Sequence, residues 1–300
     1  MDSFKVSVVV PVYNAAQFLE RSVRSALNQS EVVEVILVED KSKDQSYEIC
    51  LKLSQEDSRV KLFTHPDHQN LGAGASRNLA LQKCTSPFIS FLDADDQYLP
   101  ERFSETKILF EDMNVSGVYE PVSCEFVDEK AKSDFCQMVN IPLNEAESFL
   151  SYPKRKLVGK EFFESLVLES NGFPMTDGIT IRKFLVEKTG LFNESLRLHQ
   201  DSEYWIRLAY NGNFTTPQKT VPVATRTQHP GNRITSRNNQ SKLNYYRSLR
   251  DWSEKVNLDH SLKNFIEKRM YYFEACLKFP GSKLLPKILW RLNYSLKRRA

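Results

Sequence analysis

The sequence predicts an α/β fold in which a parallel sheet is flanked by helices and followed by a helical C-terminal extension. Strand and helix signals alternate over the first 115 residues, a pattern typical of parallel sheets with crossover helices. The expected strands are continuous apolar runs, as strands buried on both faces require. From about residue 240 the pattern is helical. With 300 residues, of which 41% are hydrophobic, the chain has enough apolar side chains for a sizeable core.

The first 115 residues contain the elements of the predicted sheet. A β-branched apolar run at 6–10, stopped by Pro11, is the first expected strand. Further strands are expected at 32–38, 60–64 and 88–92, with helices between them at 15–27, 44–55 and 74–83. Parallel sheets bind ligands at the carboxyl ends of their strands. Asn14, Asp40 and Asp93 each follow an expected strand, so we expect a ligand crevice beside them.

The middle of the chain, residues 116–235, is less regular. Strand-like and helical stretches mix there, with strands expected at 117–119, 179–181 and 222–227 and helices at 159–168 and 202–211. We therefore divide the chain into a domain over 1–235, whose two halves meet at residue 115, and a helical extension over 236–300.

Charge and cysteine usage restrict the class of protein. The formal net charge is +3, but seven basic residues follow Glu274 and leave −4 on the rest, so we expect no nucleic-acid partner. The five cysteines are scattered and form no CxxC pair, which is typical of reduced thiols. We see no signal peptide and no apolar run long enough to span a bilayer, and therefore expect a cytoplasmic protein.

A stripe of apolar side chains within 282–300 predicts an amphipathic basic helix near the C-terminus. Two interpretations stay open. In one, the helix makes a peripheral contact with the inner face of the membrane, which would suit a lipid-linked acceptor. In the other, it packs on the body of the protein with its basic face in solvent.

The acidic cluster Asp93-Ala94-Asp95-Asp96 is the strongest chemical signal. Three carboxylates within four residues repel one another, so their loop needs a cation or an unusual supply of hydrogen-bond donors. Mn²⁺ and Mg²⁺ prefer carboxylate oxygens and share their coordination with substrate phosphates. The structural alternative is that Asp96 caps a helix beginning near Pro100. Because the cluster directly follows a buried strand, we favour metal or ligand binding.

Three further motifs lie at strand ends or at the start of a helix. Tyr13 either stacks on a nucleobase or packs against the helix that follows. In the segment 38–44, one carboxylate can accept a hydrogen bond from the imide of uracil while Asp44 caps the next helix. At 70–78, small residues at a helix N-terminus let a ligand approach the backbone, and Arg77 can pair with phosphate. A plain capped helix is the alternative for this last motif.

The order and spacing of these motifs resemble the family 2 glycosyltransferases. The matching stretches are 8–14, 38–44, 70–78 and 91–96, and the resemblance is strong over 5–115 and looser to about 235. It implies a GT-A fold, with a nucleotide-sugar-binding half before residue 115 and an acceptor-binding half after it. The implied activity moves a sugar from a nucleotide-diphosphate donor, with UDP favoured, to a hydroxyl of a glycan or lipid-linked acceptor, as in polysaccharide biosynthesis of the cell envelope.

The resemblance also implies roles for individual donor-binding residues. These are Pro11, Tyr13, Asp40, Arg77, Asp93, Ala94 and Asp95. By the match, Asp40 contacts the base, Asp93 contacts the ribose, and Arg77 is similar to a basic residue near the diphosphate.

Mn²⁺ or Mg²⁺ is the implied cofactor. Asp95 matches the metal ligand at the second Asp of the family's DxD motif. His229 lies in a late segment, 226–231, that resembles one whose His reaches the metal or the diphosphate. A lone His is more often structural, so that alternative stays open. Asp177 falls where family members often line the acceptor side.

The segment 199–208 resembles the family's acidic pair followed by a helix. By that match Asp201 is the catalytic base, with Glu203 as a reserve candidate. Gln200 departs from the pattern, because an acidic residue is common at that position. The structural alternative for Asp201 is a helix cap, a role that is compatible with a base.

The expected reaction is a single displacement at the anomeric carbon with inversion. Asp201 would take the proton of the acceptor hydroxyl, and the metal at Asp95 would neutralise the departing diphosphate. Two other classes stay open. One is an aspartate-based phosphotransferase, which also carries Asp-x-Asp after a strand, although after an early one. The other is a catalytically silent nucleotide-sugar-binding protein, for which Gln200 is the only indication.

Overall fold

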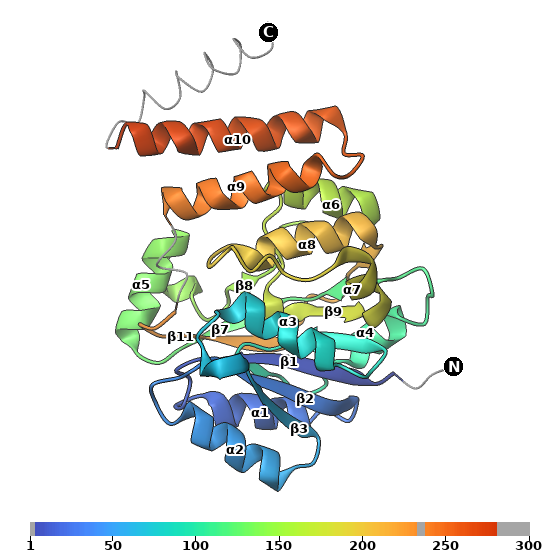
Figure 1. Cartoon of the computed structure of the whole chain (residues 1–300), viewed down its shortest axis with the longest axis vertical. Coiled ribbons are helices and arrows are strands. Elements are labelled where there is room, and N and C mark those ends of the chain that lie inside the picture. Colours follow the sequence, from blue (N-terminus) through green and yellow to red (C-terminus); the bar gives the residue numbers. More distant parts are fainter. Residues whose placement is uncertain (1–3, 233–237, 281–300) are drawn as a thin grey trace, which may run out of the picture.

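The computed structural model describes residues 4–232 and 238–280 and has an α/β architecture (Figure 1). A seven-stranded sheet runs through its centre in the order β10-β6-β9-β4-β1-β2-β3. Its strands are β1 (Val6–Val12), β2 (Val32–Glu39), β3 (Val60–Thr64), β4 (Phe88–Phe91), β6 (Gly117–Tyr119), β9 (Ile179–Arg182) and β10 (Phe214–Thr215). Strands β3, β2, β1 and β4 pair in parallel, as the sequence predicts, whereas β9 runs antiparallel to both of its neighbours.

The order of the strands reverses beside β1. The chain places β2 and β3 on one side of β1 and then returns to place β4 on the other side. In open α/β sheets, such a reversal leaves a crevice at the carboxyl ends of the two strands beside it. Asn14 follows β1 and Asp93 follows β4, so both residues lie at this crevice.

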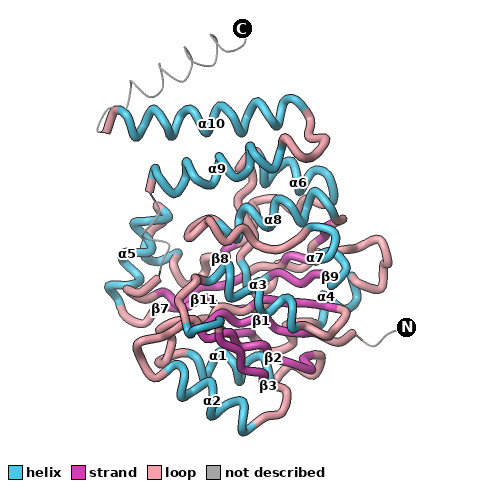
Figure 2. The backbone as a smooth tube through the Cα atoms, viewed as in Figure 1, coloured by secondary structure: helices cyan, strands magenta, loops and turns pink. Residues whose placement is uncertain are grey.

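Helices cover both faces of the sheet (Figure 2). One face carries α1 (Leu19–Leu27) and α2 (Ser46–Glu56), and the other carries α3 (Ala73–Lys83), α6 (Gly159–Val167), α7 (Lys183–Thr189) and α8 (Gln200–Asn211). Along β1, Val8 and Val10 belong to the core under α1, and Val9 belongs to the core under α3. Successive side chains of a strand face opposite sides, so a strand covered on both faces is apolar at every position.

A smaller second sheet, in the order β5-β11-β7-β8, lies beside the first. Its strands are β5 (Gln97–Tyr98), β7 (Val122–Phe126), β8 (Leu150–Ser151) and β11 (Ala224–Gln228). The helix α5 (Glu129–Val139) contacts β7 and β11, and α4 (Ser104–Leu109) follows β5 along the chain. Three single 3₁₀ turns complete the described elements: η1 (Pro66–His68), η2 (Leu143–Glu145) and η3 (Thr176–Gly178). The sequence predicts β11 but neither its partner strands nor α5. The pairing of β11 directs the residues after it, including His229, back toward the crevice.

The C-terminal helices α9 (Asn239–Ser253) and α10 (His260–Lys278) pack on each other, and α9 packs on α8 (Figure 1). Tyr246 of α9 and Phe273 of α10 belong to the same apolar core as Phe91 of the central sheet. The amphipathic helix expected over 282–300 lies outside the described residues. Within 4–232 and 238–280, no helix combines the length and the apolar character needed to cross a membrane.

Candidate active site

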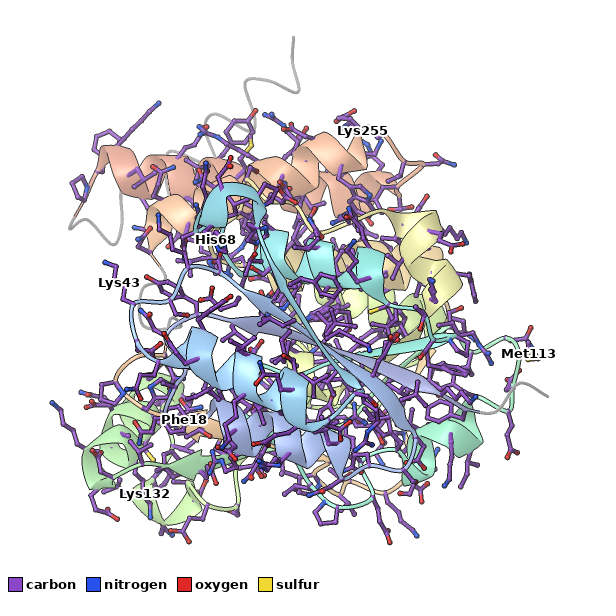
Figure 3. The ribbon with its side chains drawn as sticks, turned by 60° about the horizontal axis from the view of Figure 1, so that its bottom comes forward. Phe18, Lys43, His68, Met113, Lys132 and Lys255 are labelled. Atoms are coloured by element: carbon purple, nitrogen blue, oxygen red, sulfur yellow. The ribbon has the colours of Figure 1, made fainter. Side chains whose placement is uncertain are left out.

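A cleft of about 360 Å³ opens at the carboxyl ends of β1 and β4. Figure 3 shows Lys43 and His68, from the loops after β2 and β3, toward this end of the sheet, and Met113 at the opposite end. Of the predicted donor-binding, metal-binding and base residues, all line the cleft except Asp40, which lines an adjoining pocket of about 250 Å³; the weaker candidates Asp177 and Glu203 line neither. The predicted residues in the cleft are Pro11, Tyr13, Arg77, Asp93, Ala94, Asp95, Asp201 and His229.

Asp40 ties the turn after β2 to the loop that precedes α3. Its carboxylate oxygens accept hydrogen bonds from the backbone N–H groups of Leu71 (2.7 Å) and Gly72 (2.8 Å). Burial raises the pKa of Asp40, and these two N–H groups oppose that shift. Each carboxylate oxygen has a second lone pair, so Asp40 can also accept a hydrogen bond from a ligand.

The turn that carries Asp40 is held by side chains on both sides of it. Glu39 is buried and accepts hydrogen bonds from the backbone N–H groups of Lys41 and Ser42. Asn14 Oδ1 accepts from the backbone N–H of Lys43 (2.7 Å), which joins this turn to the loop after β1. Asn14 and Lys41 have φ values of 50° and 60°, which are uncommon for residues other than glycine. These strained positions are held by the hydrogen bonds around them.

Arg77 and Asp93 form an ion pair in the cleft. Arg77 Nη2 lies 2.5 Å from Asp93 Oδ1, and the side chain of Arg77 is only 5% exposed. The ring of Phe192 packs against the guanidinium group, 5.7 Å from its centre. The side chain of Asp93 remains 33% exposed. Arg77 therefore orients Asp93, and Asp93 remains accessible to a ligand.

Asp95 and His229 lie side by side in the cleft. His229 Nε2 is 3.0 Å from Asp95 Oδ2, and Asn232 Nδ2 donates to the same oxygen at 3.2 Å. The ring of Phe18 packs against that of His229, with centroids 4.9 Å apart. Burial alone would raise the pKa of Asp95, but the hydrogen bond with His229 and the electrostatic attraction of His229 and Arg226 together outweigh it and lower that pKa. A carboxylate and an imidazole are thus held together where both contact the cleft.

Asp96 has a structural role that differs from a helix cap. The helix after the cluster, α4, begins at Ser104, and Asp96 Oδ1 instead accepts from the backbone N–H of Thr227 (2.8 Å). This bond fixes β11 against the acidic cluster. Asp177 Oδ1 accepts from the backbone N–H of Asp93 (2.9 Å), and Asp177 is only 1% exposed. Asp177 therefore lies beneath the cluster rather than on an open acceptor surface.

Asp93, Asp96 and Asp177 each place one carboxylate oxygen within 4.8 Å of the others. Asp177 Oδ2 is buried and has no hydrogen-bond partner among the described residues. Burial, reinforced by the charge of Asp93, raises the pKa of Asp177 to about 6. Burial and the charge of Asp177 likewise raise the pKa of Asp96 well above its usual range. Such an excess of negative charge favours uptake of a proton or of a divalent cation.

An aromatic contact sets the position of α8. Trp205 packs edge-on against Phe91 at the end of β4, with ring centroids 5.2 Å apart. The contact holds the first turn of α8 at the cleft, where Asp201 is partly exposed. Asp201 Oδ1 accepts from the backbone N–H of Ser202 (2.8 Å), within the first turn rather than from a cap position.

Glu203, the reserve candidate for the base, does not line the cleft. It is 2% exposed and forms an ion pair with Arg207 (2.9 Å). The spacing of four residues between them is a common helical ion-pair spacing and was a signal available in the sequence. Gln200 does line the cleft, and its Oε1 is buried without a hydrogen-bond partner among the described residues.

Two arginines of the cleft, Arg197 and Arg226, were not predicted from the sequence. Arg226 lies on β11 near Asp96 and Asp177. Burial opposes its charge, but Asp96 and Asp177 outweigh that effect and raise the pKa of Arg226. The alternation of side chains along β11 puts Arg226 and Gln228 on one face, but the sequence does not indicate which face meets the acidic cluster.

Comparison with known proteins bears directly on this cleft. Residues 7–165, more than half of the chain, match the family model described as Glycosyl transferase family 2. The chain belongs to glycosyl transferase family 2. The match covers the four motifs that predicted the family, and the α/β architecture confirms the expected GT-A fold.

Relatives within the family share part of their length with this chain. An uncharacterised glycosyltransferase of Haemophilus influenzae is 45% identical over 92 residues, which is 30% of this chain and 36% of that protein. Glycosyltransferase GlyG of Streptococcus pneumoniae is 28% identical over 217 residues, 65% of this chain and 70% of GlyG. The chain thus spans little more than a third of the length of the Haemophilus relative.

Two solved structures share the fold. S. aureus TarS 1–349 in complex with UDP-GlcNAc superposes with a TM-score of 0.64 at 18% identity, covering 92% of this chain and 73% of that one. The mannosyltransferase PcManGT of Pyrobaculum calidifontis, in complex with GDP-Man and Mn²⁺, gives 0.55 at 15% identity, covering 97% and 80%. At these identities the likeness establishes the fold only.

Proposed function

We propose that this chain is a glycosyltransferase that moves a sugar from a nucleotide-diphosphate donor, a UDP-sugar, to the hydroxyl of a glycan or lipid-linked acceptor. The observation that carries the proposal is the pair of joined pockets at the strand reversal. One pocket holds Asp40 and the other holds Asp95 with His229, and Tyr13 lines both. A nucleotide diphosphate is a ligand with a base at one end and a metal-binding group at the other.

The donor's base is assigned to the pocket with Asp40, and its ribose to the adjoining cleft with Asp93. Tyr13 is 39% exposed, so its ring is free to stack on a base, while Pro11 shapes the wall of the cleft. Asp40 would accept from the imide of uracil, and Asp93 would accept from the ribose hydroxyls. The TarS structure, which shares this fold, contains UDP-GlcNAc, which supports a UDP-sugar as the donor.

The chemistry of the donor atoms fits a divalent cation at Asp95 and His229. Carboxylate oxygen and imidazole nitrogen are both ligands for Mn²⁺, and carboxylate oxygen suits Mg²⁺. The lowered pKa of Asp95 keeps this carboxylate ionised. When bound there, the metal supplies Lewis-acid stabilisation of the leaving diphosphate. Arg77 and Asp93 position the ribose next to it.

Asp201 is assigned as the base of an inverting single displacement. The acceptor oxygen forms a bond to the anomeric carbon as its proton passes to the Asp201 carboxylate. At the same time the bond from the anomeric carbon to the phosphate oxygen breaks, and its electrons leave with the nucleoside diphosphate. Asp201 contacts the cleft and is partly exposed, so an acceptor hydroxyl can reach it.

A thermal-shift screen of nucleoside diphosphates and nucleotide-sugars, with and without Mn²⁺, tests the proposal, because a ligand of the native state raises apparent stability. Donor turnover is then measured with Asp201→Asn and with Asp112→Asn, an exposed control near Met113 at the far end of the sheet. We expect Asp201→Asn to bind donor normally and to lose about 10²- to 10⁴-fold in turnover. Normal turnover in Asp201→Asn would remove Asp201 as the base, and absence of any nucleotide binding would overturn the proposed function.

A further inference from the structure

We infer that Arg197, on the loop before α8, binds the phosphates of the donor where the two pockets meet. The inference rests on the proposed function and extends it to a residue that neither the sequence motifs nor the family match indicates. Arg197 is exposed and lines both the pocket with Asp40 and the cleft with Asp95.

Arg197 lies between the two pockets. The two pockets share four lining residues, Tyr13, Arg197, Leu198 and Gln200. Arg197 is the charged one among them. A ligand with its base beside Asp40 and its metal-binding group beside Asp95 must pass these four residues. Past these residues the ligand continues into the cleft as the ribose, at Asp93, and then as the phosphate chain that reaches the metal, and Arg197 lines the cleft as well.

The guanidinium group of Arg197 lies close against Gly72. A Cβ atom added to Gly72 would lie 2.3 Å from Arg197 Nη1, so the guanidinium occupies room that exists because residue 72 has no side chain. Gly72 also has a φ of +90°, a conformation that favours glycine. Its N–H group is bound by Asp40 Oδ2 at 2.8 Å. The same glycine thus places Arg197 next to the residue assigned to the base.

The other guanidinium groups of the cleft already interact with carboxylates of the protein. Arg77 is buried and paired with Asp93, and Arg226 lies among the carboxylates of Asp96 and Asp177. Among the described residues, Arg197 has no hydrogen bond and no ion pair within 4.0 Å. Its planar guanidinium group can therefore donate two parallel hydrogen bonds to phosphate oxygens without breaking a hydrogen bond or an ion pair of the described residues.

Comparing nucleosides with their diphosphates isolates the effect of phosphate charge. Binding of uridine and UDP, guanosine and GDP, thymidine and dTDP, and cytidine and CDP is measured by calorimetry in Mn²⁺, on the full chain. The variants are Arg197→Gln and Arg155→Gln, an exposed arginine outside both pockets. For the base that binds, we expect Arg197→Gln to weaken the diphosphate about tenfold to a hundredfold and to leave the nucleoside unchanged. Arg155→Gln should match the wild type, and Arg197→Lys should recover part of the loss.

Three results would overturn the inference. Equal diphosphate affinity in Arg197→Gln and wild type would show that the phosphates do not contact Arg197. Equal weakening of nucleoside and diphosphate would show that Arg197 shapes the base pocket instead. If the wild type binds no nucleoside diphosphate at all, the proposed function fails and this inference fails with it, which is distinct from the first two outcomes.

Discussion

His229 Nε2 lies 3.0 Å from Asp95 Oδ2, although the two residues are 134 positions apart in the sequence. The contact forms because β11 pairs with β5 and β7 and is further fixed by the bond from Thr227 to Asp96. The second sheet therefore brings an imidazole to the acidic loop that follows β4 of the first sheet.

Replacing Asp95 or His229 should impair the use of Mn²⁺ or Mg²⁺ in sugar transfer, because either change removes a ligand of the proposed metal. We expect Asp95→Asn to lower turnover about a hundredfold or more, because a metal contributes several kcal/mol of charge stabilisation at a leaving group. His229→Gln should raise the Mn²⁺ concentration needed for half-maximal activity. His68→Gln, an exposed histidine after β3, is the control and should behave as wild type. Full activity of the wild type in EDTA would contradict the assignment.

The raised pKa of Asp177 predicts a pH-dependent stability. Its folded pKa of about 6 exceeds the ordinary value of 3.8, so the folded state holds a proton that the unfolded state has lost. The contribution of Asp177 to stability therefore falls as pH rises from about 4 to 6, by on the order of 2–3 kcal/mol. In urea unfolding with EDTA, Asp177→Asn should gain stability relative to wild type as pH rises from 4.5 to 7. If the difference in the free energy of unfolding between Asp177→Asn and wild type stayed constant from pH 4.5 to 7, the raised pKa of Asp177 would be refuted.

The buried ion pair of Arg102 and Glu120 supports the floor of the site. The two side chains are 0% and 1% exposed, and Arg102 Nε also donates to the carbonyl oxygen of Asp177 (3.2 Å). Arg102→Met leaves Glu120 buried without its partner and should cost about 3–5 kcal/mol of the free energy of unfolding. Lys160→Met, in an exposed pair with Glu164, should change it by less than about 1 kcal/mol. If Arg102→Met and Lys160→Met lowered the free energy of unfolding equally, the buried pair would contribute no more to stability than the exposed one.

The close approach of α3 and α8 predicts a coupling between Gly74 and Gln200. A Cβ atom at Gly74 would lie 2.2 Å from Gln200 Oε1, and Gln200 is buried. Gly74→Ala should therefore destabilise the wild type by about 1–3 kcal/mol. In a Gln200→Ala background the same change should be neutral or stabilise by up to about 1 kcal/mol, because alanine is the better helix former. Additive effects in the double-mutant cycle would contradict the contact.

The fold of the first 115 residues was predictable because its signals are local. Continuous apolar runs marked β1, β2, β3 and β4, and the bounds of β3 (Val60–Thr64) agree with the prediction. The antiparallel direction of β9 and the short strands β5 and β8 were not predictable. Strand direction depends on the path of the preceding chain, and two-residue strands have too few side chains to show a period.

The lining of the cleft was predictable where motifs lie at strand ends or, as for Arg77 and Asp201, near the start of a helix. Asp93 and Tyr13 were found at strand ends, because a parallel sheet brings the carboxyl ends of its strands to one edge. Asp177 was noted but placed on the acceptor side. Its contact with Asp93 spans 84 residues and depends on β9, whose direction was not foreseen. Arg197 lies on a loop without a periodic pattern, so no local signal pointed to it.

The apolar core that joins the central sheet to α9 and α10 has a consequence for folding during synthesis. The first strands emerge from the ribosome early and can pair at once, since domains begin to fold from the N-terminus. The core is complete only when Phe273 has emerged, because Tyr246 and Phe273 share it with Phe91. Until then the nascent chain exposes the apolar side of α9, on which α10 packs, and a chain cut short before α10 would present that surface to chaperones and proteases. Completion of the fold therefore waits for α10, the last helix that the structure describes.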